Sequence, residues 1–108
     1  MSEEIEFLDA CETASRIAAK DISSVEVTEA AIRRAERLQP VLNAFISLEA
    51  EVALDAARAV DTRIANGEPV GSLAGVPLAH KDMYYREGKV TTCGSKIRKD
   101  FVADHTAT

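Results

Sequence analysis

The stretch Gly71–Thr108, GSLAGVPLAHKDMYYREGKVTTCGSKIRKDFVADHTAT, decides the fold of this chain. It holds both histidines, one of the two cysteines and four of the five glycines, whereas the sequence before it has the pattern of amphipathic helices. Its centre, Ala74–Met83, is an apolar run interrupted by Gly75 and Pro77, and such a run predicts a short buried strand. Because Pro77 cannot donate to a strand ladder, we place it in the first residues of that strand or in an edge strand.

The predicted strand ends in a cation, Lys81, which is followed at once by an anion, Asp82. This places Lys81 at the carboxyl end of a strand, where open α/β sheets have their functional sites. Burial there would favour the neutral amine, which can act as a base. The structural alternative is a lysine that extends from the strand end to water, or that pairs with Asp82 or another carboxylate. Spacing alone favours the structural alternative, because most paired or perturbed lysines are structural.

Composition narrows the class of protein. The chain has 108 residues, the size of one ordinary domain, and its net charge of −5 without a basic patch predicts no direct nucleic-acid partner. No apolar run approaches the roughly 20 residues needed to span a bilayer, so we expect no membrane insertion. The acidic start MSEEIEF does not resemble a signal peptide, so we expect a cytoplasmic protein. Cys11 and Cys93 are expected to be free thiols, and the sparse histidines and cysteines predict no metal site and no cofactor.

Residues 1–66 predict three amphipathic helices. Ser23 and Glu26 form a capping-box pattern, so the second helix should begin near Ser24, and Pro40 should stop it. Ser47 is the expected N-cap of the third helix and Gly67 its C′ residue, with an extended link between the second and third helices. The expected ranges are Phe7–Lys20, Val25–Leu38, Val41–Ser47 for the link, and Leu48–Asn66; the expected apolar stripe of the first helix is Leu8, Cys11, Ala14, Ile17 and Ala18.

After Met83 the sequence predicts turns at Gly88 and at Gly94-Ser95 around a second short strand, Val90–Cys93. Asp104 or Thr106 has the character of an N-cap for a helix beginning at Ala107-Thr108. Two short strands without a third partner are marginal, so we expect the chain to be one end of a larger α/β protein. We therefore treat residues 1–108 as the N-terminal part of a single domain, with a helical region, 1–66, and a strand-rich region, 71–108.

Two other motifs do not fit a functional site. Gly88 followed by Gly94-Ser95-Lys96 has the wrong spacing for a phosphate-binding loop. A thiol–imidazole pair of Cys93 with His80 or His105 lacks anything that would bring the groups together, so a half-buried, structural Cys93 is preferred.

The motif Gly75-Val-Pro-Leu-Ala-His-Lys-Asp82, followed by Thr91-Thr-Cys-Gly-Ser-Lys96, resembles the opening of the amidase signature family. The upstream pattern Ser23-Ser-Val-Glu-Val-Thr-Glu29, the helix to Pro40 and Leu42-Asn-Ala-Phe45 also fit, so the resemblance covers nearly all of the chain. It implies an α/β fold in which N-terminal helices precede the first strands of a larger mixed-sheet α/β/α domain.

The resemblance also implies a Ser–cis-Ser–Lys triad that hydrolyses or transfers amides, with Lys81 as the catalytic lysine. In that mechanism the neutral lysine accepts a proton through a bridging serine, and a second serine attacks the amide carbonyl. Family members carry both serines downstream of these motifs, so this chain alone is expected to be inactive. Ser95 belongs to the Thr-Thr-x-Gly-Ser turn and is expected to be structural. His80, where an aliphatic residue is more usual, is expected to be a packed, hydrogen-bonded strand residue, with a place in the substrate wall as the alternative.

Several functions stay open at this point. The first is an amidase for a small-molecule amide, completed by the rest of the same protein or by a partner chain. The second is a part resembling the A subunit of a glutamine-dependent tRNA amidotransferase, which is weakly disfavoured by Met83, where many family members have Asn. The third is a non-catalytic helical interaction module or homodimer surface. The sequence does not name the amide.

Overall fold

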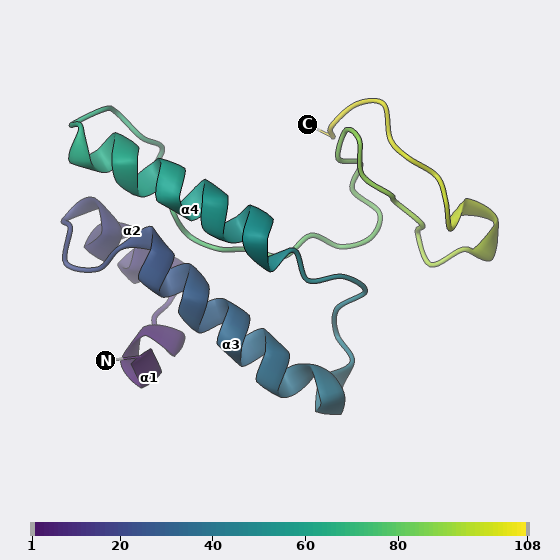
Figure 1. Ribbon diagram of the computed structural model, residues 1–108, viewed down its shortest axis with the longest axis horizontal. Helices are drawn as coiled ribbons and strands as arrows, with labels where there is room; N and C mark the ends of the chain where they lie inside the picture. Colours follow the sequence, from purple (N-terminus) through teal and green to yellow (C-terminus); the bar gives the residue numbers. More distant parts are fainter. Residues whose placement is uncertain (1, 108) are drawn as a thin grey trace. The chain divides into compact units, whose positions relative to one another are not determined.

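A computed structural model of the chain describes residues 2–107. They form two compact units, one ending at Pro77 and the other beginning at Leu78, and each is described by itself. The described part of the first unit contains four helices, α1 (Ser2–Glu6), α2 (Ala10–Ala18), α3 (Ser24–Leu42) and α4 (Ala50–Ala65), as Figure 1 shows. Within it, α3 packs against both α4 and α1. None of the helices in the described residues is long and apolar enough to cross a membrane.

The first predicted helix, Phe7–Lys20, is wrong at its start. Asp9 is the N-cap of α2, because its carboxylate accepts a hydrogen bond from the backbone N–H of Glu12 at 2.8 Å. The Thr13 hydroxyl also donates to the Asp9 carbonyl oxygen at 2.7 Å, so the helix begins at Ala10. The preceding residues form the separate helix α1. An aspartate that can accept from the first turn is a good helix start, and it ends the run of helical backbone before it.

The start of α3 confirms the predicted cap, whereas its end corrects the prediction. Ser23 Oγ accepts from the N–H of Glu26 at 3.0 Å, and the helix begins at Ser24. Pro40 does not stop the helix, which continues to Leu42. In the last turn a proline removes a single backbone donor, and the helix ends where Asn43 adopts a left-handed backbone, φ 47°, with its N–H donating to the Gln39 carbonyl at 2.8 Å.

The third predicted helix is correct at its end and wrong at its start. Ser47 is not the N-cap of α4; Glu49 occupies that position, without a side-chain cap bond, and Ser47 lies in the irregular link. At the other end Gly67 has φ 72°, as expected of a C′ glycine, and donates to the Ile64 carbonyl at 3.1 Å. Glu68 N–H donates to the Arg63 carbonyl at 3.0 Å, which completes a Schellman motif.

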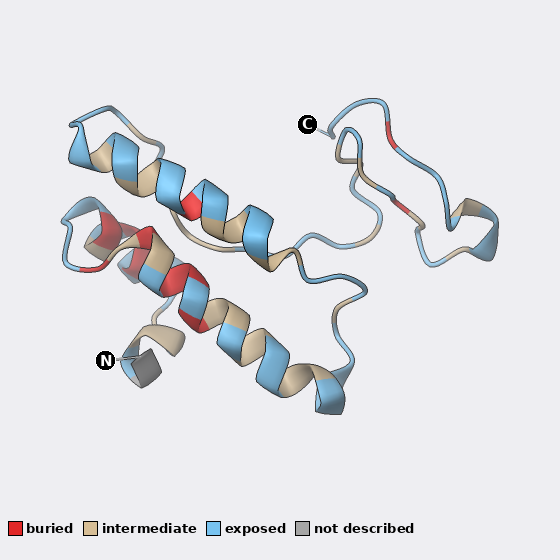
Figure 2. Cartoon of the chain, viewed as in Figure 1, coloured by how far each residue is buried: buried red, intermediate tan, exposed pale blue. Residues whose placement is uncertain are grey.

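The core of the first unit lies at the N-terminal half of α3. Ile17, Ile22 and Val27 are buried together, and Ile5, Leu8 and Ile64 pack against them. Figure 2 shows the buried residues gathered on this half of α3, whereas the C-terminal half is intermediate or exposed. In the predicted stripe of the first helix, Ala14 and Ile17 are buried, but Cys11 and Ala18 are exposed.

Asp61 and Gly75 tie the later part of the first unit to the first turn of α3. The Asp61 carboxylate accepts from the backbone N–H groups of Ser24, at 2.7 Å, and Val25, at 3.1 Å. The Ser24 hydroxyl donates to the Gly75 carbonyl at 2.8 Å. This contact fixes the beginning of the Gly75–Asp82 motif on the end of a helix.

Neither predicted strand forms within the described residues. Residues 74–83 contain no strand, and turns at Gly71–Ala74 and Leu73–Val76 occupy the beginning of that stretch. A strand needs a neighbour for its backbone groups, and no other described segment pairs with this one. The second prediction is met only by an isolated antiparallel bridge between Val90 and Val102.

The second unit is organised around that bridge. Thr91 N–H donates to the Phe101 carbonyl at 2.9 Å, and Ala103 N–H donates to the Lys89 carbonyl at 3.1 Å. Between the bridge residues lies the short 3-10 helix η1 (Lys96–Arg98). Arg98 stacks on the Phe101 ring, 4.1 Å from its centroid, and donates to the Tyr85 hydroxyl at 2.7 Å. Among the described residues of this unit, Thr91 and Ala103 are the buried ones.

Candidate functional site

Lys81 lies at a tight turn with its side chain exposed. Its carbonyl oxygen accepts from the N–H of Met83 at 2.7 Å and of Tyr84 at 3.2 Å, so the chain reverses directly after the lysine. The sequence predicts Lys81 at the end of a buried strand. Within the described residues the lysine amine is neither at a strand end nor removed from water. It is available to a group that approaches from outside the chain.

Asp82, the next residue, is half-buried and faces Thr92. One carboxylate oxygen, Oδ1, accepts from the Thr92 backbone N–H at 2.9 Å, and the other, Oδ2, accepts from the Thr92 hydroxyl. Both oxygens of Asp82 are thus bonded to one residue ten positions away. Of the structural alternatives for Lys81, pairing with Asp82 is not what holds this carboxylate, because Thr92 binds it, whereas the exposed Lys81 side chain agrees with a lysine that extends to water.

The hydrogen bonds to Asp82 favour its ionised form. The Thr92 hydroxyl contributes most to lowering the pKa of this carboxyl, followed by the Thr92 backbone N–H. Partial burial acts in the opposite direction, and the Gly94 N–H and the Lys81 charge add smaller lowering effects. Asp82 is therefore a fixed anion beside an exposed cation.

Thr92 belongs to the predicted turn at Gly94-Ser95, which is confirmed. Ser95 N–H donates to the Thr92 carbonyl at 2.9 Å, and the two central residues, Cys93 and Gly94, have positive φ angles of 53° and 73°. The Thr92 hydroxyl oxygen accepts from the Gly94 N–H at 3.1 Å, so the residue that binds Asp82 is itself held by the turn. Two successive positive φ angles are typical of a type I′ turn.

Ser95 has a structural hydroxyl, as predicted. Its Oγ accepts from the Ile97 N–H at 3.2 Å and caps η1. Cys93 is exposed rather than half-buried, because it occupies the corner of the turn, and both Cys11 and Cys93 are free thiols.

The two histidines do not join this site. His80 is exposed, so the expectation of a packed strand histidine is wrong in this chain, which has no strand there to pack it. His105 lies 2.6 Å from Asp104, measured from Nδ1 to Oδ1, and its ring meets the edge of Tyr85 with centroids 5.3 Å apart. The hydrogen bond and charge of His105 lower the pKa of Asp104. Among the described residues, no cluster of histidine, cysteine and carboxylate side chains is arranged to hold a metal ion.

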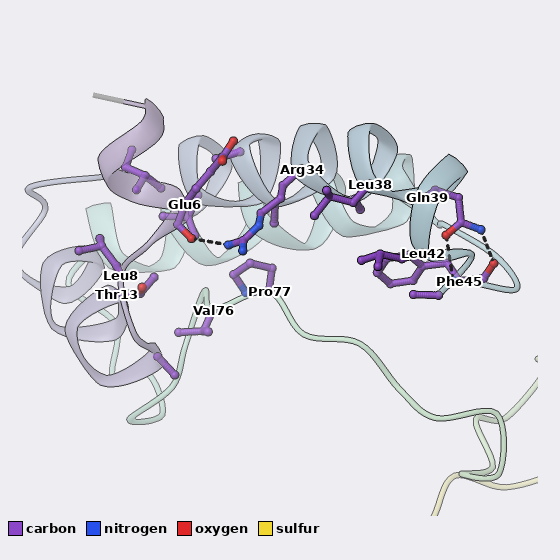
Figure 3. Close-up of a pocket in the computed structure, with 17 residues that line it drawn as sticks. Glu6, Leu8, Thr13, Arg34, Leu38, Gln39, Leu42, Phe45, Val76 and Pro77 are labelled. Atoms are coloured by element: carbon purple, nitrogen blue, oxygen red, sulfur yellow. Dashed lines mark hydrogen bonds between the residues drawn. The ribbon is translucent and has the colours of Figure 1, made fainter.

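A cavity of about 390 Å³ lies in the first unit, along α3 (Figure 3). Arg34 reaches across it and donates to the Glu6 carbonyl at 2.8 Å, and Gln39 both donates to and accepts from the backbone of Phe45. These polar groups bind the protein itself, and the described lining holds no serine, cysteine or lysine. Sequence reasoning missed the cavity because its walls come from distant segments, namely residues 5–13, 27–45 and 76–77.

Comparisons with known proteins show which family and which relatives this chain resembles. The family model described as Amidase matches residues 26–108, which include Lys81, Asp82 and Thr92. A curated relative from Acidothermus cellulolyticus, named as the A subunit of glutamyl-tRNA(Gln) amidotransferase, is 48% identical over 99 residues, which are 92% of this chain and 20% of the relative. The chain thus spans about a fifth of the length of the curated relatives it matches.

Two solved structures resemble the chain closely in fold. A fatty acid amide hydrolase superposes with a TM-score of 0.92 at 29% identity, covering 97% of this chain and 19% of that one. A bacterial aryl acylamidase of the amidase signature family superposes with a TM-score of 0.83 at 36% identity, covering 90% of this chain and 20% of that one. Both neighbours are α/β enzymes, so the matched region here has the same local fold as part of an α/β domain.

Proposed function

Because this chain belongs to the amidase signature family, we propose that it is the lysine-bearing part of an enzyme that hydrolyses or transfers amides. The observation that carries the proposal is the position of Lys81 in the sequence motif of the family. Lys81 stands at the lysine position of the Gly-x-Pro-x-Ala-x-Lys-Asp motif, inside the matched region, with an exposed side chain beside an anchored carboxylate. Residues 1–108 are proposed to be part of one domain, completed by polypeptide outside them.

In the proposed reaction Lys81 is the base. Its neutral amine accepts a proton from a bridging serine, which takes one from a second serine, and that second serine forms a bond to the amide carbonyl carbon. The carbon–nitrogen bond then breaks, the amine leaves with a proton returned from Lys81, and water or another acceptor releases the acyl group. Both serines are proposed to come from outside these residues, since Ser95 is engaged in capping η1.

The rest of the domain has two proposed roles around Lys81. A lysine acts as a base only when it is neutral, and exclusion of water favours that form. The Lys81 side chain is exposed in this chain, so the cover is proposed to come from the additional polypeptide. The same polypeptide is proposed to supply partner strands for residues 74–83 and 90–93, which would complete the mixed sheet predicted from the sequence.

A chimera tests the proposal. The matching fifth of the bacterial aryl acylamidase is replaced by this chain, and release of the aryl amine from an aryl acylamide is measured. We expect Lys81→Ala to lower kcat by about 10²–10⁴-fold, the contribution typical of a general base. Lys99→Ala, which removes another exposed lysine of the same unit, is the control. If the chimera is active and Lys81→Ala does not lower its kcat, the proposal is wrong.

A second candidate is a part resembling the A subunit of a tRNA-dependent amidotransferase. The 48% identity to the Acidothermus cellulolyticus relative favours it, and this identity over 99 residues outweighs the argument from the single residue Met83. Under this candidate the enzyme acts with partner subunits, and glutamyl-tRNA(Gln) is the acceptor.

Free Cys11 and Cys93 are consistent with the proposed cytoplasmic location of either candidate.

A second chimera separates the candidates. This chain replaces the matching segment of the Acidothermus cellulolyticus relative, and formation of glutaminyl-tRNA from glutamyl-tRNA(Gln) is measured in the assembled amidotransferase. Transfer at a rate near that of the host, together with an inactive acylamidase chimera, supports the amidotransferase. Activity only in the acylamidase chimera supports an amidase that works without transfer.

A further inference from the structure

We propose that Asp82 is a positioning residue for Lys81, acting through a bidentate contact with Thr92. This inference rests on the proposed function, because it concerns how the proposed base is held. Its basis is geometric, namely the turn after the lysine, the two-point contact of the carboxylate and the fixed anchor that receives it.

The backbone turns directly after Lys81. The Lys81 carbonyl accepts from the N–H groups of both Met83 and Tyr84, at 2.7 Å and 3.2 Å, which makes Asp82 the corner of a chain reversal. The direction of the Lys81 side chain is therefore tied to the orientation of this corner. An exposed turn without further contacts would be free to rotate about its flanking bonds.

The second step is the contact that fixes the corner. Asp82 binds Thr92 with both carboxylate oxygens, one to the backbone N–H at 2.9 Å and one to the hydroxyl. Two bonds from one planar group restrict its rotation more than a single bond does, and bonds to an ionised acceptor are stronger than neutral ones. The corner is held without using the Lys81 side chain, which stays exposed.

The third step is the rigidity of the anchor. Thr92 follows Thr91, which is 2% exposed and donates from its backbone to the Phe101 carbonyl. The Thr92 hydroxyl oxygen and carbonyl oxygen also accept from Gly94 and Ser95 within the turn. Asp82 therefore connects the lysine to the most buried strand-like part of the second unit.

The first test uses the 108-residue chain itself and needs no activity. Amide hydrogen exchange and backbone NMR shifts are compared for Asp82→Ala, Thr92→Val and Thr92→Ser. In Asp82→Ala the Thr92 N–H should lose about tenfold of its protection, the equivalent of one hydrogen bond. The Lys81 and Met83 amide signals should shift in Asp82→Ala and Thr92→Val, and return in Thr92→Ser, which restores the hydroxyl.

Thr106→Val is the matched control. The Thr106 hydroxyl oxygen accepts from the Glu87 N–H at 3.1 Å in the same unit, so this variant also removes one side-chain-to-backbone contact. A shift of the Lys81 signals in Thr106→Val as large as in Thr92→Val would overturn the inference, because it would show a general loosening of the unit. Thr92→Val keeps the backbone bond to Asp82 and serves as the test if Asp82→Ala fails to fold.

The second test uses the active chimera. Asp82→Ala and Thr92→Val should lower kcat by about 10²-fold with KM little changed, as expected when a catalytic group is misplaced. Thr92→Ser should recover most of that loss. If Lys81→Ala lowers kcat as expected but neither Asp82→Ala nor Thr92→Val lowers it, the positioning inference is wrong and the proposed function stands. If Lys81→Ala leaves turnover intact, the proposed function fails first.

Discussion

At the scale of single residues, Gly75 occupies a position that a side chain would disturb. Its backbone has φ +86°, and a Cβ atom built there would lie 3.0 Å from Cβ and Oγ of Ser24 and 3.2 Å from Cδ1 of Ile17. The Ser24 hydroxyl donates to its carbonyl. The positive φ and the close approach of the backbone to the core are therefore both reasons for a glycine at the start of the motif.

Gly75→Ala should be clearly more destabilising than Gly67→Ala. Gly67 has a similar positive φ of +72° but nothing within 4 Å of the added atom, so it reports backbone strain alone, about 1–2 kcal/mol. Gly75→Ala should add about 1–3 kcal/mol for crowding against Ser24 and Ile17. Urea unfolding of both variants measures the difference, and equal losses would show that the neighbours move aside freely.

Protonation of Asp82 in acid should lower the stability of the chain. Its pKa lies below the ordinary aspartate value, mainly because the Thr92 hydroxyl and N–H bind the ionised form. The stabilisation is therefore complete above the ordinary value of about 3.9 and is lost as pH falls through the lower pKa of the folded chain. An NMR titration of the Asp82 carboxyl carbon should give a midpoint below about 3.9.

Asp82→Asn provides the comparison for that pH dependence. At neutral pH this variant should be less stable than the parent, because it lacks the charge that Thr92 favours. The difference should shrink as the parent carboxylate is protonated. A difference that stays constant down to low pH would show that the charge contributes nothing.

At the scale of elements, the first turn of α3 is capped by two residues from different parts of the chain. Ser23 binds Glu26, and Asp61 of α4 binds the N–H groups of Ser24 and Val25. An anion at this end of a helix also interacts favourably with the helix dipole. The contact joins α3 to α4 in addition to their apolar packing.

Asp61→Ala should lower the free energy of unfolding by about 1–3 kcal/mol, because it leaves two part-buried N–H groups without their acceptor. Asp61→Asn should lose less, since one oxygen remains. Asp55→Ala on the same helix is the control, because the Asp55 side chain is 76% exposed and its ion pair with Arg58 should matter by less than about 0.5 kcal/mol. Thermal unfolding compares the three, and a loss in Asp55→Ala as large as in Asp61→Ala would contradict the cap.

Helix ends were predictable from the sequence where a local signal governs them. Ser23 with Glu26 and the glycine at position 67 act within a few residues, and both predictions are confirmed. Pro40 misled the prediction, because its restriction on the preceding residue is overridden in the last turn of a packed helix. The Asp61 cap was not predictable, since its partners lie 37 and 36 positions away.

The choice of Lys81 as the site residue stays a prediction, whereas the surroundings expected for it differ from those in the structure. Lys81 was identified by an unusual cation after an apolar run and by the motif around it. The strand expected at 74–83 is absent from the described residues, because strand formation depends on partner segments and not on the run itself. The bond from Asp82 to Thr92 joins two polar residues across a turn, and no periodicity reports such a pair.

At the scale of the whole molecule, many large apolar side chains are exposed in both units. At the end of α3, Val41 and Leu42 are 81% and 62% exposed, and Ile46 in the link that follows is 79% exposed. Of these residues Leu42 also lines the cavity along α3, together with Phe45 (Figure 3). Exposed apolar side chains that are close together in the sequence often mark a contact with further polypeptide.

The isolated chain should therefore bind the dye ANS, and the combined change Leu42→Ser and Ile46→Ser should reduce the fluorescence. Because both side chains are exposed, each change should alter the free energy of unfolding by no more than about 0.5 kcal/mol. Ile97→Ser, at a side chain that is 96% exposed in the other unit, should have a smaller effect. Equal reductions would show that the dye does not distinguish this surface.

The bond between Asp61 and Ser24 also has a consequence for the order of events during synthesis. Because a ribosome synthesises the chain from its N-terminus, all of α3 is synthesised before position 61 is added. Until then the first turn of α3 has the Ser23 cap without the Asp61 contact, and most of the stability of helices in proteins comes from packing against other elements. We therefore expect the nascent chain to acquire its stable pair of α3 and α4 only after α4 has left the ribosome.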